Sequence, residues 1–110
     1  MEYLNKVILQ GVVGSVNYSK VADKFHIVFS LCTEYAYKAD GNAFIDVTWH
    51  MCILFDNQID IQKGDKLRVE GRLKQTRYVD SSGIERSYMD VIVNNYHKIT
   101  DEDLKKYYGD

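Results

Sequence analysis

The sequence lacks proline, low-complexity linkers and internal repeats throughout its 110 residues. A chain of this length makes one domain with a modest core, in which roughly two-thirds of the extended-chain surface becomes buried. Its hydrophobic fraction of 45% excludes a disordered chain, because disordered segments are poor in apolar residues. We expect one folded domain over residues 1–99 and a short acidic segment over residues 100–110.

Cysteine is also scarce, and Cys32 and Cys52 show no CxxC or other metal-binding spacing. They are interpreted as free thiols in a reducing cytoplasm. The N-terminal residues have neither a cleavable signal pattern nor a long apolar run, and no segment is apolar enough to span a membrane. These absences predict a soluble, cytoplasmic protein without a membrane partner.

Motifs of catalysis are missing as well. His26, His50 and His97 do not follow a metal signature, and there is neither a glycine-rich phosphate loop nor a nucleophile elbow. His26, His50, Cys32 and Cys52 could in principle converge across neighbouring strands, but buried thiols and hydrogen-bonded histidines are the commoner outcome. We therefore predict no catalytic residue, no metal site and no cofactor.

The chain has no excess of basic charge, and its formal net charge is −2. Residues 101–110 contain four acidic and two basic residues, so residues 1–100 carry twelve of each sign. A neutral body can still bind a polyanion when its basic groups share one face. The distribution of charge therefore leaves nucleic-acid binding open.

Aromatic residues, in contrast, are abundant, with nine Tyr, four Phe and one Trp, and this favours β-structure or an aromatic binding surface. Polar turns at 38–42, 63–65 and 80–83 and a polar loop at 17–24 separate five segments with strand character. Gly11 and Gly14 end or bend the first strand. The five predicted strands cover residues 7–13, 25–33, 44–55, 67–78 and 85–96.

Alternation along these strands predicts the core. Residues 51–55 are apolar on both parities, which predicts burial on both sides of the third strand there. Thr100 is placed to cap a short C-terminal helix, and residues 56–62 have room for at most one helical turn. The side chains expected to point inward are Phe25, Ile27, Phe29, Leu31, Leu67, Val69, Gly71, Leu73, Met89, Val91 and Val93.

Five strands with an irregular link between the third and fourth fit an all-β fold, namely the five-stranded Greek-key barrel of the OB type. An open sandwich is the structural alternative.

The outward parity of the fourth strand combines cations with an aromatic ring. Cations neutralise phosphates and tyrosine offers a flat face to a base, although an ordinary solvated strand face has the same pattern. The residues of this parity are Arg68, Glu70, Arg72, Lys74, Thr76 and Tyr78.

Further aromatics lie at strand ends and loops, interleaved with basic residues. Each aromatic taken alone is readily explained as core or rim packing, but together they indicate a path for a flexible, stacked strand. The aromatics are Tyr35, Tyr37, Trp49, Phe55, Tyr78 and Tyr88, and the basic residues are Lys20, Lys24, Lys38, Arg72, Lys74, Arg77 and Arg86.

Several short motifs, in order from residue 5 to about residue 96, resemble the bacterial single-stranded DNA-binding protein family. They are Asn-Lys-Val-Ile-Leu at 5–9, Gly11 and Gly14, Thr-Trp-His at 48–50, Ile-Leu-Phe at 53–55, Lys-Gly-Asp at 63–65, Val-Glu-Gly-Arg-Leu at 69–73, and the last hairpin with residues 80–83, Arg86 and residues 90–93.

The resemblance implies an OB fold, usually assembled into homotetramers, that wraps single-stranded DNA without reading its sequence. By position, the family's base-stacking aromatics correspond to Tyr37, Trp49, Phe55 and Tyr78. The family often has tryptophan where this chain has Tyr37 and Tyr78. We assign the phosphate contacts to Arg72, Lys74, Arg77, Arg86 and Lys6.

The sequence also departs from the family. The segments 15–24 and 55–63 are shorter than usual, and the family's long tail with an acidic tip, which recruits replication and repair proteins, has no counterpart before Asp110. Either the sequence is truncated or it is a short tailless form, as in some phages or mobile elements. The acidic residues 101–103 are interpreted as a helix start, and partner docking is the minority interpretation.

Two other functions remain open at this point. The chain is also similar to OB-fold interaction modules of primosome assembly, whose main partner is another replication or recombination protein. A small metal-dependent enzyme is the second alternative, disfavoured because no metal signature is present.

Overall fold

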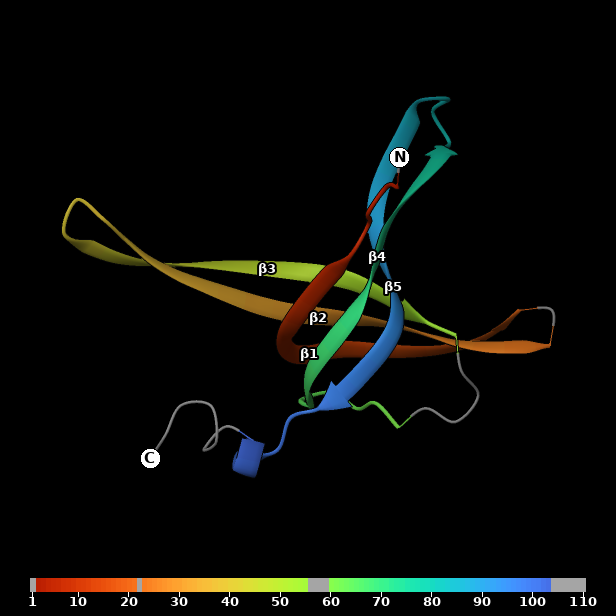
Figure 1. Ribbon diagram of the computed structural model, residues 1–110. Helices are drawn as coiled ribbons and strands as arrows, with labels where there is room; N and C mark the ends of the chain where they lie inside the picture. Colours follow the sequence, from red (N-terminus) through yellow and green to blue (C-terminus); the bar gives the residue numbers. More distant parts are fainter. Residues whose placement is uncertain (1, 22, 56–59, 104–110) are drawn as a thin grey trace.

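Five strands account for most of the computed structural model, which describes residues 2–21, 23–55 and 60–103. They are β1 (Val7–Val21), β2 (Lys24–Ala39), β3 (Asn42–Leu54), β4 (Lys66–Val79) and β5 (Glu85–Lys98). The strands close into a barrel in the order β1-β2-β3-β5-β4 (Figure 1). β3 and β5 pair in parallel and the other neighbours pair antiparallel. This topology confirms the five-stranded OB barrel and excludes the open sandwich.

The interior of the barrel is filled by the alternate residues of each strand, because successive side chains of a strand point to opposite faces. Ile61, from the link between β3 and β4, packs into the same core, and the hydroxyl of Tyr18 donates a hydrogen bond to its carbonyl oxygen at 2.9 Å. The buried cluster contains Val13, Ile27, Phe29, Leu31, Cys52, Leu54, Ile61, Leu67, Val69, Val91 and Val93.

Two glycines allow the strands to approach closely enough for closure. A Cβ atom at Gly11 would lie 2.0 Å from the carbonyl oxygen of Cys32, and one at Gly71 would lie 2.0 Å from that of Ile92. The pairing of β4 with β5 shifts register at Gly71, and that of β1 with β2 shifts between Val13 and Val16. The second shift confirms the predicted bend of the first strand.

The predicted loop over residues 17–24 is wrong. β1 continues to Val21 and pairs with the start of β2, so a hairpin stands in its place. The ammonium of Lys20 lies 5.2 Å from the ring centroid of Phe25 across this hairpin. Residues 17–24 are mostly polar because the hairpin extends away from the barrel and has solvent on both faces.

The prediction that Leu73, Met89 and Phe25 point into the core is also wrong. Leu73 and Met89 have the predicted parity but are 42% and 52% exposed, because the β4–β5 hairpin extends beyond the closed barrel, where no opposing strand covers it (Figure 1). Phe25 is exposed for the same reason at the end of the β1–β2 hairpin.

The predicted burial of residues 51–55 on both sides of the third strand is wrong, because the strand is buried on one side only. Cys52 and Leu54 point into the core, whereas Met51 and Phe55 are exposed and Ile53 is half-buried. A barrel has a single interior, so the other parity faces outward even where it is apolar.

The C-terminal helix starts where the sequence predicts it. Residues 101–103 are helical, the hydroxyl of Thr100 accepts a hydrogen bond from the amide of Asp103 at 3.2 Å, and the Asp103 carboxylate accepts one from the amide of Thr100 at 2.8 Å. This is a capping box with Asp in the acidic position. Residues 104–110 lie outside the described residues, as do residues 56–59 of the predicted helical turn. In the described ranges, no helix is long and apolar enough to cross a bilayer.

Candidate nucleic-acid interface

The outward face of β3 carries an exposed apolar row, which runs along the strand from the β2–β3 hairpin onto the barrel. Contiguous exposed apolar side chains on a barrel exterior mark a binding surface more often than chance. Trp49, the single tryptophan, is 60% exposed at the middle of this row. The row comprises Ile45, Val47, Trp49, Met51 and half-buried Ile53, and Phe55 follows directly after the strand.

Gly14 on β1 fixes the position of the Trp49 ring. A Cβ atom at Gly14 would lie 2.5 Å from Cζ3 of Trp49 and 2.8 Å from the hydroxyl oxygen of Ser30. The Ser30 hydroxyl in turn accepts a hydrogen bond from the Ser15 amide at 2.9 Å. The benzo edge of the indole therefore lies against Gly14 of β1, while most of the side chain is exposed to a ligand. The sequence suggested only a bend at Gly14.

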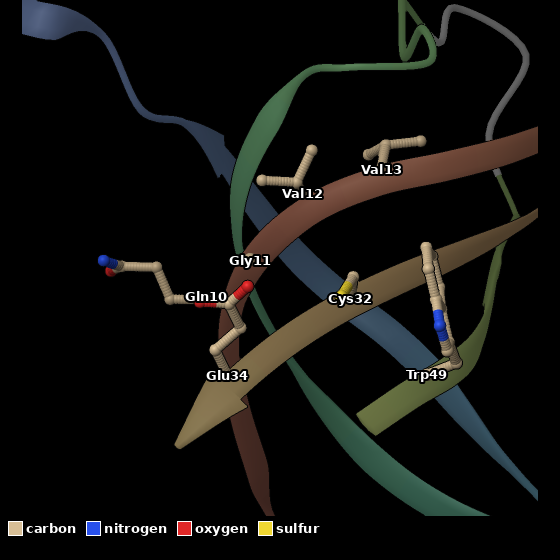
Figure 2. Close-up of a pocket in the computed structure, with 7 residues that line it drawn as sticks. All are labelled: Gln10, Gly11, Val12, Val13, Cys32, Glu34 and Trp49. Carbon is tan, nitrogen blue, oxygen red and sulfur yellow. The ribbon is translucent and has the colours of Figure 1, made fainter. Parts of the chain in front are cut away.

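A hollow lies on each side of Trp49. The one toward β1 is lined by Gln10, Gly11, Val12, Val13, Cys32, Glu34 and Trp49, and Figure 2 shows the indole standing along one side with Gln10 and Glu34 on the other. The one toward β5 is lined by Val28, Trp49, Met51, Ile53, Tyr88, Met89 and Asp90. Trp49 is thus the wall between two concave sites of mostly apolar lining, as ligand sites usually have.

The two thiols differ sharply in environment. Cys52 is fully buried, and burial, followed by the nearby carboxylate of Asp90, raises the pKa of its thiol to about 12. Cys32 lines the hollow beside Trp49.

Since the thiolate is the reactive form of cysteine, a disulfide reagent at pH 8 is expected to modify one thiol of the native protein and both thiols in denaturant. The reagent's chromophore measures the stoichiometry. Cys32→Ser should abolish the native reaction, and fast reaction of both thiols in the native protein would contradict the assignment.

Phe55 is exposed next to the outward face of β2. Its ring centroid lies 5.7 Å from that of His26, and the planes are inclined by 44°. Phe55 shares the outward parity of Trp49, so the structure places both predicted stacking residues on one side of the barrel wall.

The β4–β5 arm presents most of the predicted cations on one face. Register pairs Lys74 with Asp90 and Tyr78 with Arg86, and Arg72 has the same parity. The rings of Tyr78 and Tyr88 lie 5.8 Å apart at 60°. Cations and aromatic rings therefore share this face, which suits a strand of stacked bases and phosphates.

Two cations of the predicted set differ from the others. Arg77 pairs with Ser87 and so lies on the opposite face of the arm. The Nε of Arg86 donates to the carboxylate of Asp80 in the hairpin turn, and this bond, followed by those from the Ile84 and Ser82 amides, lowers the pKa of Asp80. Part of the Arg86 charge is thus neutralised within the protein.

Lys6 lies beside the base of the arm. The side-chain amide of Asn5 donates to the carbonyl of Leu73 at 2.8 Å and accepts from its amide at 2.9 Å, and Val7 pairs with Gly71. Lys6, between these two anchored residues, therefore lies next to Arg72.

Tyr37 is separated from Trp49. The β2–β3 hairpin extends from the barrel as a long arm (Figure 1). Tyr37 pairs with Phe44, whose parity is opposite to that of Trp49, so the two predicted stacking residues occupy opposite faces of this β2–β3 arm. Tyr37 stacks on Phe44 at 5.5 Å and 22°, and Tyr35 stacks on Tyr37 at 6.4 Å and 29°. Phe44 was not predicted as a site residue, because its stacking on Tyr37 depends on the register between β2 and β3.

Tyr88 was noticed in the sequence but not assigned to a site, and it lines the β5-side hollow with Trp49. Over the described ranges, no three His, Cys, Asp or Glu side chains are grouped so that they could hold a metal ion.

Comparison with known proteins agrees with this geometry. Residues 4–99 match the family model described as "Single-strand binding protein family". The "Single-stranded DNA-binding protein" of Xanthomonas axonopodis pv. citri (strain 306) is 28% identical over 99 residues, covering 83% of this chain and 55% of that protein. The protein of the same name from Xanthomonas campestris pv. campestris is 27% identical over 99 residues, covering 83% and 58%. The chain spans somewhat more than half the length of these relatives.

Solved structures share the barrel. "Plasmodium falciparum SSB complex with ssDNA" superposes with a TM-score of 0.83 at 18% identity, covering 91% of this chain and 98% of that one. The small single-stranded DNA-binding protein from Streptomyces coelicolor gives a TM-score of 0.67 at 17% identity, covering 89% and 95%. At these identities the likeness establishes the fold.

Proposed function

The chain belongs to the single-strand binding protein family, and we propose that it binds and protects single-stranded DNA without reading its sequence and catalyses no reaction. The processes served are replication, recombination or repair in the cytoplasm. Residues 1–99 form the DNA-binding domain, and residues 100–110 form a separate acidic segment.

One observation carries this proposal: an exposed indole, fixed over Gly14, separates two hollows beside an arm that bears cations. A base can stack on the free face of Trp49 whatever its identity, because every base has a π-face. Phe55 and Tyr78 provide further stacking surfaces on the same side. Tyr37, with Tyr35 and Phe44, provides a platform on the other face of the β2–β3 arm.

Phosphates are assigned to Arg72, Lys74, Arg86 and Lys6, which gather on or beside the β4–β5 arm. Arg77 serves a strand passing over the opposite face of the arm. A homo-oligomer is part of the proposal, with a homotetramer as the form that family resemblance implies. Exposed Val12 on β1 and Met51 on β3 supply apolar surface for such an assembly.

The salt dependence of binding tests the phosphate contacts. For single strands, log K falls against log salt with a slope of about −0.7 per neutralised phosphate. Arg72→Ala is therefore expected to reduce the slope for oligo(dT) by about 0.7, while Arg86→Ala reduces it less, because Arg86 is paired with Asp80. Fluorescence anisotropy at several salt concentrations measures the slope.

Lys63→Ala, in the turn at the far end of β4 from the arm, is the matched control and should leave the slope unchanged. Equal slopes for Arg72→Ala and Lys63→Ala would show that the β4–β5 arm does not contact the phosphates. Absence of any oligo(dT) binding by the unchanged protein would favour the protein-interaction module instead.

A further inference from the structure

The hollow between β3 and β5 arises because these two strands pair over a very short length. They pair in parallel only at Cys52 with Val91 and at Ile53 with Ile92. Before these pairs along each strand, β3 continues from the β2–β3 arm and β5 from the β4–β5 arm, and the arms diverge (Figure 1). The cleft at the divergence encloses about 540 Å³, which lies within the roughly 300–1,000 Å³ of small-ligand sites.

An aromatic residue from each strand lines this cleft, Trp49 from β3 and Tyr88 from β5. Trp49 is three residues before Cys52, and Tyr88 is three residues before Val91, so the parallel register places them at the same height on the two strands. Gly14 supports the indole and Tyr78 contacts the ring of Tyr88. Val28, Met51 and Ile53 add apolar side chains to the lining. A flat, partly apolar ring fits against such a lining.

The lining of the cleft also includes one acidic residue. Asp90 lines the hollow and is 4% exposed. The Thr76 hydroxyl donates to it, and Lys74 is its register partner on β4. An ionised carboxylate accepts hydrogen bonds and donates none, and it has about four lone-pair sites. Thr76 occupies one of these sites, so the group can accept another hydrogen bond, and its charge repels a phosphate.

Bases differ in what they offer to such a group. Cytosine, adenine and guanine carry exocyclic amino donors, whereas thymine and uracil present a carbonyl oxygen at the position of the cytosine amino group. A carboxylate accepts from the cytosine N4 amino group. At the same position on thymine it meets the O4 oxygen, which repels it, and the one donor on that edge of thymine, the N3–H group, lies between two carbonyl oxygens. The cleft therefore favours an amino-bearing base with its edge toward Asp90.

We propose that the β3–β5 cleft is a base pocket, walled by Trp49 and Tyr88, in which the Asp90 carboxylate selects amino-bearing bases over thymine and uracil. The pocket rests on the proposed function, since it requires a bound single strand. The protein would then bind every sequence, but with an affinity that depends on the base composition.

The test compares dC30 and dU30 oligomers at pH 8 on the unchanged protein and on Asp90→Asn. The asparagine keeps the size of the side chain and can still accept from Thr76, but its amide also donates to the uracil O4 oxygen. The ratio of the dC30 to the dU30 affinity is expected to fall by about 3- to 10-fold in Asp90→Asn, as the loss of one hydrogen bond predicts. Differences between the free oligomers cancel, because both proteins bind the same two.

Tyr88→Ala is the companion variant, expected to weaken both oligomers equally because a ring wall does not distinguish their edges. Should Asp90→Asn fail to fold, the unchanged protein is titrated with an oligomer of N4,N4-dimethyldeoxycytidine, which has no amino hydrogen and should bind no better than dU30. An unchanged ratio with both oligomers still bound would overturn the base pocket and leave single-strand binding standing. Failure of the unchanged protein to bind either oligomer would overturn the proposed function itself.

Discussion

Gly71→Ala is expected to destabilise the protein by about 3 kcal/mol or more. The added Cβ would lie 2.0 Å from the carbonyl oxygen of Ile92, 2.9 Å from its carbonyl carbon and 3.1 Å from the Cα of Val93. All three atoms belong to the backbone of β5, so no side-chain rotation can relieve the overlap. Separation of the strands would break the β4–β5 pairing that closes the barrel.

Urea denaturation followed by circular dichroism measures this change. Gly41→Ala is the matched control, because Gly41 has a φ of +80° but nothing within 4 Å of the added carbon. It should cost only the conformational penalty of about 1 kcal/mol. Equal losses for the two variants would show that the close approach of β4 and β5 does not require glycine at position 71.

Trp49→Ala is expected to weaken oligo(dT) binding by about 5- to 150-fold. This range corresponds to the loss of about 1–3 kcal/mol of binding free energy for one stacked base. The fold should persist, because most of the side chain is exposed and the core cluster does not include it. Trp49→Phe should recover part of the loss, since a phenyl ring still stacks.

Anisotropy titration at fixed salt measures the affinities. Phe25→Ala is the control: Phe25 is 50% exposed, comparable to Trp49, but lies at the end of the β1–β2 hairpin on the inward parity of β2. Its loss should leave affinity unchanged. An affinity unaltered by Trp49→Ala would remove the indole from the binding surface.

The strands of the barrel could be predicted because alternation and turn residues are local signals. Phe29 and Leu31 on β2 and Leu67 and Val69 on β4 are buried as their parity indicates. The hairpin over residues 17–24 could not be predicted, because a polar strand is recognised by its partner and not by its composition. Leu73 and Met89 were misplaced because parity defines a face but not where the barrel ends.

Part of the candidate site could also be predicted from the sequence, namely the residues that share one face of a single strand. Parity along a single strand placed Arg72, Lys74 and Tyr78 together, as the structure has them. Tyr37 and Trp49 were grouped although they lie on opposite faces of one arm, because the register between β2 and β3 is needed to separate them. Tyr88 escaped assignment since its position opposite Trp49 depends on a parallel pairing of only two residue pairs.

The most direct test of single-strand binding is the fluorescence of Trp49 during titration with oligo(dT), at low and at high salt. Trp49 is the single tryptophan, so the signal reports one position. We predict strong, saturable quenching at low salt that persists at high salt with weaker affinity, because stacking survives screening while phosphate contacts weaken. Absence of quenching, together with absence of binding by anisotropy, would contradict the account.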